Sequence, residues 1–100
     1  MSAVFKALAD PTRRKVLQLL KNGPLGASKL AGHFDVTKPT MSAHFAVLLA
    51  ADLIHAEKHG RAVTYRLKVS VLIEAIREFT EAFGLEITER HNLKRTTPTT

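Results

Sequence analysis

Hydrophobic positions recur at helical spacing between residues 36 and 51, and the rest of the chain is organised around this segment. The apolar positions, separated by steps of three and four residues, are Met41, Phe45, Leu48 and Leu49. Such spacing places them on one face of an α-helix. Thr37 can cap the N-terminus, and Pro39 falls in the first turn, where a missing amide hydrogen costs nothing. The pattern therefore predicts a helix from Val36 to Ala51.

The other sides of this predicted helix carry small or polar side chains in place of the usual glutamate, lysine and glutamine. They are Lys38, Thr40, Ser42, Ala43 and His44. Short side chains permit close approach to a grooved surface, which suits insertion into the major groove of DNA with the N-terminal residues touching base edges. The alternative is an ordinary core helix. The patterns of the neighbouring segments distinguish it from a DNA-binding helix.

Three shorter helices are predicted before this one. The first spans residues 4–8, the second residues 11–22 with Asp10 as its N-cap, and the third roughly residues 27–34. A tight turn joins the third helix to the helix over residues 36–51. Two short helices joined in this way form a helix-turn-helix.

After Ala51 alternation replaces helical spacing. It predicts two strands with apolar positions at Leu53, Ile54, Ala56, Ala62, Val63, Tyr65 and Leu67. Residues 58–61 form the turn between them. A hairpin directly after a helix-turn-helix is a wing, and Lys58 and Arg61 at its tip are placed to contact phosphates or an adjacent minor groove. The alternative role for a cationic tip is simple protection of a sheet edge. The position of the hairpin directly after the helix-turn-helix favours the DNA contact.

A long amphipathic helix is predicted to follow, from a cap at Ser70 to about Glu89. Its apolar stripe consists of Val69, Leu72, Ile73, Ile76, Phe79, Phe83 and Ile87. The preceding helices and the hairpin already supply a core, and an exposed apolar face of this length is a liability on a monomer. We therefore expect the helix, over about 69–89, to pair with its copy in a second subunit. Residues 1–90 then form one domain, and residues 91–100 are expected to be a disordered tail.

Charge is unevenly distributed along the chain. Within a net charge of +6, residues 1–68 carry eleven lysines and arginines against four acidic residues, whereas residues 69–90 carry two against five. The basic part contains the suspected groove-binding helix, as expected for a protein with one face toward a polyanion. Arg13, Arg14 and Lys15 add three adjacent cations, for which phosphate contact and simple solvation both remain open.

Composition excludes several classes of function. The chain has no cysteine, which removes disulfides, thiolate metal sites and thiol redox sensing. It has no apolar run of membrane-spanning length and no signal-peptide pattern, so we expect a soluble, cytoplasmic protein without a membrane partner. It has no glycine-rich phosphate loop and no nucleophile elbow, so we do not expect an enzyme.

Three segments resemble the ArsR/SmtB family of bacterial winged-helix repressors, most closely its SdpR-like branch. They are FKALADPTRRKVL at residues 5–17, TKPTMSAHF at residues 37–45 and GRAVTYRL at residues 60–67. The similarity covers roughly residues 2–90. It agrees with the fold that the pattern predicts, a mainly α winged helix-turn-helix with a small β-hairpin, in the order α-α-α-α-β-β-α.

The resemblance implies a homodimer that represses transcription by occluding a promoter at a palindromic operator in double-stranded DNA. The dimer would use its first and last helices as the interface. By position, the residues facing DNA would be Lys38, Thr40, Ser42, Ala43 and His44, with Lys58 and Arg61 on the wing. The expected interface residues are Phe5, Leu8, Leu72, Ile76, Phe79 and Phe83.

The chain departs from the metal-sensing members of this family. Their cysteine ligands are absent, and the last helix has no histidine before its end. Glu86, Glu89 and His91 are weak candidates for a Zn²⁺ or Ni²⁺ site, and we favour a solvated helix end. We therefore expect no cofactor and no metal requirement for folding or DNA binding, and assign any sensory input to an unidentified co-regulator protein or small-molecule inducer. The alternative functions are a winged-helix module that binds protein and a metal-responsive repressor.

Overall fold

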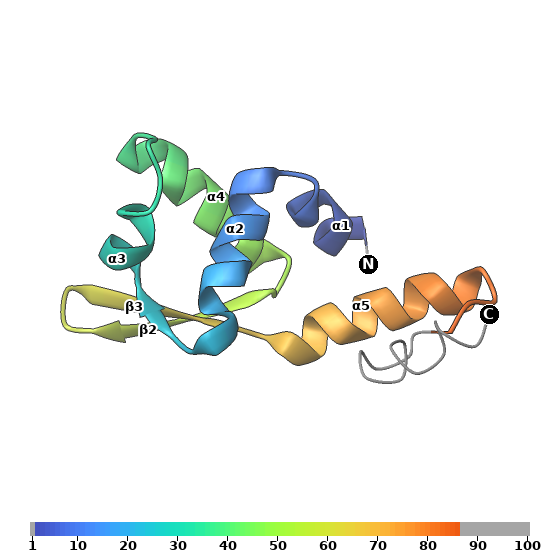
Figure 1. Cartoon of the computed structure of the whole chain (residues 1–100). Coiled ribbons are helices and arrows are strands. Elements are labelled where there is room, and N and C mark those ends of the chain that lie inside the picture. Colours follow the sequence, from blue (N-terminus) through green and yellow to red (C-terminus); the bar gives the residue numbers. More distant parts are fainter. Residues whose placement is uncertain (1, 87–100) are drawn as a thin grey trace, which may run out of the picture.

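The computed structural model describes residues 2–86, which form five α-helices, one 3₁₀ turn and a three-stranded antiparallel sheet (Figure 1). The elements are α1 (Ser2–Leu8), α2 (Pro11–Leu19), η1 (Leu20–Asn22), β1 (Leu25–Gly26), α3 (Ala27–Ala31), α4 (Lys38–Ala50), β2 (Ile54–His59), β3 (Ala62–Leu67) and α5 (Val69–Ala82). This order confirms the predicted winged helix-turn-helix, in which α3 and α4 are the helix pair and β2 and β3 form the wing.

One hydrophobic core holds the helix-turn-helix and the wing together. Its largest fully buried side chains are Val16, Leu30, Met41, Leu48, Leu53 and Ile54. No polar or charged side chain is buried among the described residues. Burying each large apolar side chain contributes about 1.5–3 kcal/mol, and these residues come from α2, α3, α4, β2 and the loop before β2. The core therefore keeps α4 and the wing in a fixed relation.

Two of the three predicted N-cap side chains, Asp10 and Thr37, form their cap bonds. The Asp10 carboxylate accepts hydrogen bonds from the backbone N–H of Thr12 at 2.8 Å and of Arg13 at 3.1 Å. The Thr37 hydroxyl oxygen accepts one from the N–H of Thr40 at 3.3 Å. These bonds satisfy amides that the first turn of a helix leaves unpaired, so they set where α2 and α4 begin.

The Asp10 cap predicts a pH-dependent contribution to stability. The N–H of Arg13, followed by that of Thr12, holds the pKa of the Asp10 carboxyl below its ordinary value of 3.8. A pKa that is lower in the folded state means that the cap stabilises the protein above about pH 4, and that this stability is lost as the pH falls through the folded-state pKa. We expect Asp10→Ala to lower the melting temperature by a few degrees at neutral pH, and its difference from wild type to shrink below about pH 4.

Asp35→Ala is the matched control for this measurement, because Asp35 is an exposed aspartate outside the helix caps. Thermal unfolding followed by circular dichroism across the pH range should separate the two variants. A pH-independent difference between Asp10→Ala and wild type would show that the carboxylate charge does not contribute through the cap.

The sheet contains one strand more than the sequence predicts. β3 is its central strand, with β2 on one side and the two-residue β1 on the other, where Leu25 pairs with Tyr65. Two residues are too few for alternation to be visible in a sequence. Long-range pairing therefore identifies β1, which joins the start of α3 to the middle of β3.

Helix α3 ends three residues before its predicted end. It stops at Ala31, with Gly32 at the cap position, and the N–H of Phe34 bonds to the C=O of Ala31 at 3.1 Å. Such i to i+3 bonds close turns that do not continue a helix. Residues 32–37 consequently form the connection to α4.

The predicted apolar face of α4 is correct except at Leu49. Met41, Phe45 and Leu48 are buried, but the Leu49 side chain is 39% exposed. Consecutive residues of a helix point about 100° apart, so the residue directly after Leu48 lies beyond the edge of the core face. Val47, on the opposite flank, packs against the core instead.

The prediction that Ser70 caps α5 is wrong. Lys68 occupies the cap position without a side-chain cap bond. Its N–H donates to the C=O of Leu53 at 2.8 Å, and its C=O accepts from the N–H of Val71 at 3.1 Å. Its ammonium group also binds the Asp52 carboxylate at 2.8 Å. Because this anchor sets the start of α5, Ser70 falls inside the first turn.

Helix α5 ends at Ala82, short of its predicted end. Gly84 has a φ of 69° and donates to the C=O of Glu81 at 3.1 Å, while the N–H of Leu85 donates to the C=O of Thr80 at 2.8 Å. This pair of bonds around a left-handed glycine is a Schellman motif, which terminates a helix. The predicted tail over residues 91–100 lies outside the described residues.

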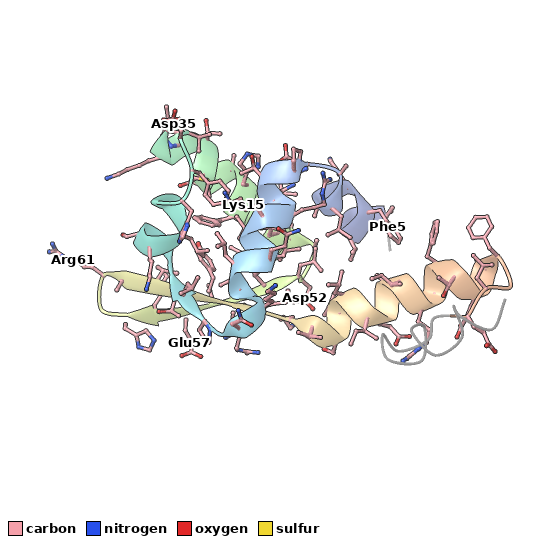
Figure 2. All side chains as sticks on the ribbon, in the orientation of Figure 1. Phe5, Lys15, Asp35, Asp52, Glu57 and Arg61 are labelled. Atoms are coloured by element: carbon pink, nitrogen blue, oxygen red, sulfur yellow. The ribbon has the colours of Figure 1, made fainter. Side chains whose placement is uncertain are left out.

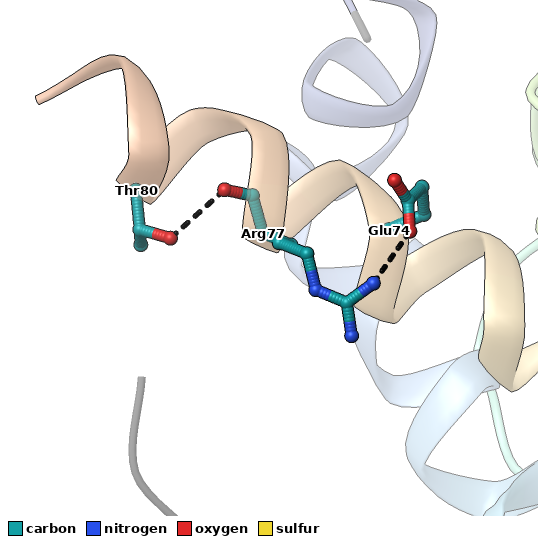
Figure 3. A network of polar contacts seen from close by, with 3 residues as sticks. All are labelled: Glu74, Arg77 and Thr80. Carbon is teal, nitrogen blue, oxygen red and sulfur yellow. Dashed lines mark hydrogen bonds and ion pairs between the residues drawn. The ribbon is translucent and has the colours of Figure 1, made fainter. Parts of the chain in front are cut away.

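Helix α5 extends away from the body of the molecule (Figure 1). Ala75 is its one buried residue, and Val71 and Leu72 pack against the core. On its polar side Arg77 binds Glu74 at 2.9 Å, so these two charges are paired within the helix (Figure 3). The N-terminal half of α5 is thus attached to the domain, while its C-terminal half presents an apolar stripe to solvent.

Candidate nucleic-acid interface

The residues of α4 that were predicted to face DNA lie on its solvent side. Lys38, Thr40, Ser42 and Ala43 are exposed, and His44 is half-buried. The buried side of the helix faces the core, so packing orients the small and polar side chains outward. Figure 1 shows the N-terminal turns of α4 at the end of the molecule opposite α5. This edge of α4 is therefore accessible to a large partner.

A shallow groove with a volume of about 580 Å³ separates α3 from α4. Lys38 and Ser42 line it from α4, Ser28 lines it from α3, and Met41 and Phe45 contribute apolar surface. Because Lys38 and Ser42 border this open hollow, the amine and the hydroxyl remain available to an external partner.

His44 is anchored to α2, a contact that the sequence pattern does not indicate. A terminal nitrogen of the Arg13 guanidinium lies 3.2 Å from Nδ1 of the His44 ring. Arg13 also donates to the C=O of Ala7 at 2.8 Å and to that of Lys6 at 3.0 Å. These carbonyls belong to the last turn of α1, where a helix leaves its acceptors unpaired. One side chain therefore links the end of α1 to α4.

Arg14 and Lys15 also make contacts within the chain. Arg14 donates to the C=O of Leu8 at 2.7 Å, and Lys15 Nζ lies 5.5 Å from the centre of the Phe34 ring. Cations suit both places, because the C-terminus of a helix carries partial negative charge and an aromatic face attracts a cation. The three adjacent cations thus have partners within the chain. Neither of the two roles that the sequence left open for them, phosphate contact and solvation, includes such contacts. The sequence did contain one signal for these contacts: a short helix ends directly before a helix whose first turns are basic.

The wing is the β2–β3 hairpin, and both predicted cations lie at its tip. β2 pairs with β3 as far as His59 and Ala62, so the turn consists of Gly60 and Arg61 and is shorter than predicted. Gly60 has a φ of 65°, the sign that a type II′ turn requires at its first central position. Lys58, the last cation before this turn, is exposed, and Arg61 points away from the body of the molecule (Figure 2).

Three aromatic rings form a row across α1 and α5, which we call the α1–α5 aromatic row. The ring centroids of Phe5 and Phe79 are 5.1 Å apart, as are those of Phe79 and Phe83. Phe5 lies on the side of α1 that faces α5 (Figure 2), whereas Phe79 is 44% exposed and Phe83 66%. The remaining predicted interface residues, all half-buried, are Leu8, Leu72 and Ile76.

Only one of the three weak metal candidates lies in the part of the chain that the structure describes. Glu86 is exposed, whereas Glu89 and His91 lie outside that part. Between residues 2 and 86, no group of three or more histidine, aspartate or glutamate side chains could hold a metal ion. Over the same residues, no helix has both the length and the apolar character needed to cross a membrane.

Comparison with known proteins relates this architecture to one family. A helix-turn-helix domain model matches residues 8–57. The transcriptional repressor SdpR of Bacillus subtilis (strain 168) is 43% identical over 76 residues, which are 76% of this chain and 84% of SdpR. The crystal structure of an ArsR family transcriptional regulator is similar with a TM-score of 0.71 and 32% identity, covering 86% of this chain and 92% of that one. For a possible transcriptional regulator for arsenical resistance the TM-score is 0.70 and the identity 32%, with coverages of 95% and 93%.

These similarities extend over the whole described architecture. The helix-turn-helix match includes α3 and α4, and the two crystal structures cover most of this chain and of their own. The family consists of DNA-binding regulators and not of enzymes, which agrees with the exposed small and polar face of α4. The chain therefore belongs to the ArsR/SmtB family of winged-helix, DNA-binding transcriptional repressors.

Proposed function

We propose that this repressor acts as a homodimer that occludes a promoter by binding a palindromic operator in double-stranded DNA. The exposed small and polar face of α4, carried by the same core as a cationic wing tip, is the observation that supports it best. Small side chains let a helix approach base edges, and the major groove presents a distinct pattern of donors and acceptors for each base pair. Because DNA is the proposed partner, we place the protein in the cytoplasm.

Helix α4 and the wing have separate roles in this proposal. The residues of α4 that approach base edges are Lys38, Thr40, Ser42, Ala43 and His44. Lys58 and Arg61 contact phosphates or the adjacent minor groove, because exposed cations on a projecting hairpin suit sequence-independent attraction to the backbone. Base contacts then provide the sequence preference, and the wing provides affinity for any duplex.

A second copy of the chain is the proposed partner of the α1–α5 aromatic row. The large apolar side chains that are exposed on α5 and directly after it are Val69, Ile73, Phe79, Phe83 and Leu85. A soluble protein seldom leaves a contiguous apolar patch exposed unless it is an interface. A two-fold dimer buries the same surface of both subunits, and it would hold two α4 helices at the spacing of two half-sites.

We assign the signal that releases the operator to a co-regulator protein or a small-molecule inducer. A metal-responsive repressor that uses Glu86, Glu89 and His91 is the weaker alternative, since two carboxylates and an imidazole can bind Zn²⁺ or Ni²⁺. The alternative of a winged helix that binds only protein is not favoured, because the family binds DNA.

Selection of bound sites from random duplex DNA tests the proposal. We expect enrichment of inverted half-sites about one helical turn apart, or a multiple of that distance. Affinity should fall steeply as salt increases, because each phosphate contact releases counterions from the DNA. Binding that is indifferent to salt, with no enriched palindrome, would contradict the proposal.

Two variants that add the same charge locate the interface. Ala43→Glu puts a carboxylate on the outer side of α4, where it would face DNA phosphates, and Ser70→Glu puts one on the polar side of α5. Both positions are exposed, so both variants should fold. We expect binding to be lost in the first and retained in the second. Equal losses would indicate a general effect of charge and contradict the role of α4.

A further inference from the structure

We propose that Arg13 is a positioning residue that fixes His44 as a hydrogen-bond donor toward DNA. The inference rests on the proposed contact between α4 and DNA, and it specifies the chemistry that His44 recognises. The partner must be a hydrogen-bond acceptor, which on DNA means purine N7 or O6, thymine O4 or a phosphate oxygen.

The donor-only chemistry of arginine determines the tautomer of His44. A guanidinium carries five N–H donors, has no acceptor and stays protonated. Its terminal nitrogen lies 3.2 Å from Nδ1 of His44, and two donors facing each other would repel. Nδ1 must therefore accept, and the hydrogen of the neutral imidazole resides on Nε2. The edge of the ring away from Arg13 consequently presents a donor and no acceptor.

Arg13 is itself held in place by the ends of two helices. Its side chain donates to the carbonyls of Ala7 and Lys6 at the end of α1, at 2.8 Å and 3.0 Å, and its backbone N–H donates to the Asp10 carboxylate. Turning the guanidinium toward DNA would break the bonds to α1. The structure thus favours an indirect role, in which Arg13 acts through His44 and not through a phosphate.

Arg14 provides a matched control for Arg13. It is the adjacent arginine of the same helix, and it donates to the C=O of Leu8 at 2.7 Å, also at the end of α1. Arg13, and not Arg14, contacts His44. Arg14→Met therefore removes a comparable charge and a comparable bond to α1 while leaving the ring contact intact, so a difference between the two arginine variants reports on His44.

Nitrogen-15 NMR of the histidine rings, at mildly alkaline pH and without DNA, tests the tautomer directly. We expect the Nε2–H form for His44 in the wild type and in Arg14→Met, and a mixture of both tautomers in Arg13→Met. A merely structural role for Arg13 would leave the tautomer unchanged in its variant. An Nδ1–H form in the wild type would overturn the proposal, and this measurement needs no variant to fold.

Operator binding supplies the second test, as a double-mutant cycle. If the acceptor is a base, His44→Ala and Arg13→Met should each lower the ratio of operator to unrelated-DNA affinity by about ten- to a hundredfold, the loss of one base contact. The double variant should lose no more than His44→Ala alone, because both act through one ring. Arg14→Met should leave the ratio within about twofold. Should Arg13→Met fail to fold, Arg13→Lys keeps the charge but cannot span both carbonyls and the ring, and should show the same loss.

The outcomes of the cycle separate this inference from the proposed function. Losses that add in the double variant would show that Arg13 acts independently of His44, and would overturn the positioning role while operator binding stands. If His44→Ala weakens all duplexes equally, the acceptor is a phosphate oxygen, whereas a loss confined to the operator identifies a base. In a chain that binds no operator at all, the proposed function fails, and the NMR result still decides the tautomer.

Discussion

Replacing Phe79 by glutamate should convert the proposed homodimer into a folded monomer and abolish operator binding. Phe79 is the middle ring of the α1–α5 aromatic row, 5.1 Å from both Phe5 and Phe83 by ring centroid. One winged-helix unit makes few base contacts, so a specific operator requires two units at fixed spacing. Loss of the interface should therefore remove specific binding and retain weak binding to any duplex.

The partial exposure of Phe79 explains both the size of this effect and why the monomer should stay folded, because the side chain lies outside the buried core. Phe79 is 44% exposed, so a dimer would bury about half of each ring. Complete burial is worth about 1.5–3 kcal/mol, and the two half-rings of a symmetric dimer together contribute about the same amount. Carboxylates placed in a dry interface add a desolvation cost. We expect the dissociation constant of the dimer to rise at least about a hundredfold.

Sedimentation and operator binding of Arg77→Glu provide the control. Arg77 lies on the polar side of α5, where it pairs with Glu74 (Figure 3). Its replacement adds more negative charge than Phe79→Glu does, without touching the aromatic row. This variant should remain dimeric and bind the operator. A wild type that sediments as a monomer, or a Phe79→Glu variant that stays dimeric, would contradict the proposed interface.

Ser42→Ala and Arg61→Ala should weaken DNA binding in different ways. Ser42 is exposed on α4 and borders the α3–α4 groove, whereas Arg61 is in the turn of the wing. Loss of the Ser42 hydroxyl should cost about 1–3 kcal/mol at the operator and much less on unrelated DNA, as expected for a base contact. Arg61→Ala should weaken both about equally and reduce the salt dependence.

Titrations of operator and unrelated duplexes at two salt concentrations distinguish these two patterns. His44→Ala should resemble Ser42→Ala, but it also removes the partner of Arg13. A melting curve of that variant is therefore needed to separate stability from recognition, whereas Ser42 lies at the surface. If Arg61→Ala proved selective for the operator and Ser42→Ala did not, the assigned roles of α4 and the wing would be reversed.

Features that depend on neighbouring residues were predictable from the sequence. The caps by Asp10 and Thr37 are bonds to amides two or three residues away, so their residue types are visible in a short window. The same holds for the period of α4 and for the alternation of the hairpin, which depend on local spacing. Together with the resemblance of the three segments, they predicted the winged helix-turn-helix.

The end of α5 was predictable in principle, because Gly84 allows the left-handed conformation that its Schellman motif requires. The long apolar stripe favours a helix that continues past Gly84, and the conformational freedom of one glycine is the weaker of the two signals. The start of α5 was not predictable in this way. It depends on a bond from Lys68 to Leu53, which joins two elements across the fold and leaves no trace in the residue types.

The sequence by itself determined the order of the α-helices and of the two hairpin strands, the exposed small and polar face of α4 and the basic character of the first 68 residues, because each follows from local spacing or composition. Tertiary structure alone decided that β1 joins the sheet, that Leu49 is exposed and that Arg13 contacts His44. These outcomes depend on which surfaces meet, and His44 lies 31 positions from Arg13. No periodicity reports a contact between side chains so far apart in the chain, because only the packing of α1, α2 and α4 brings them together.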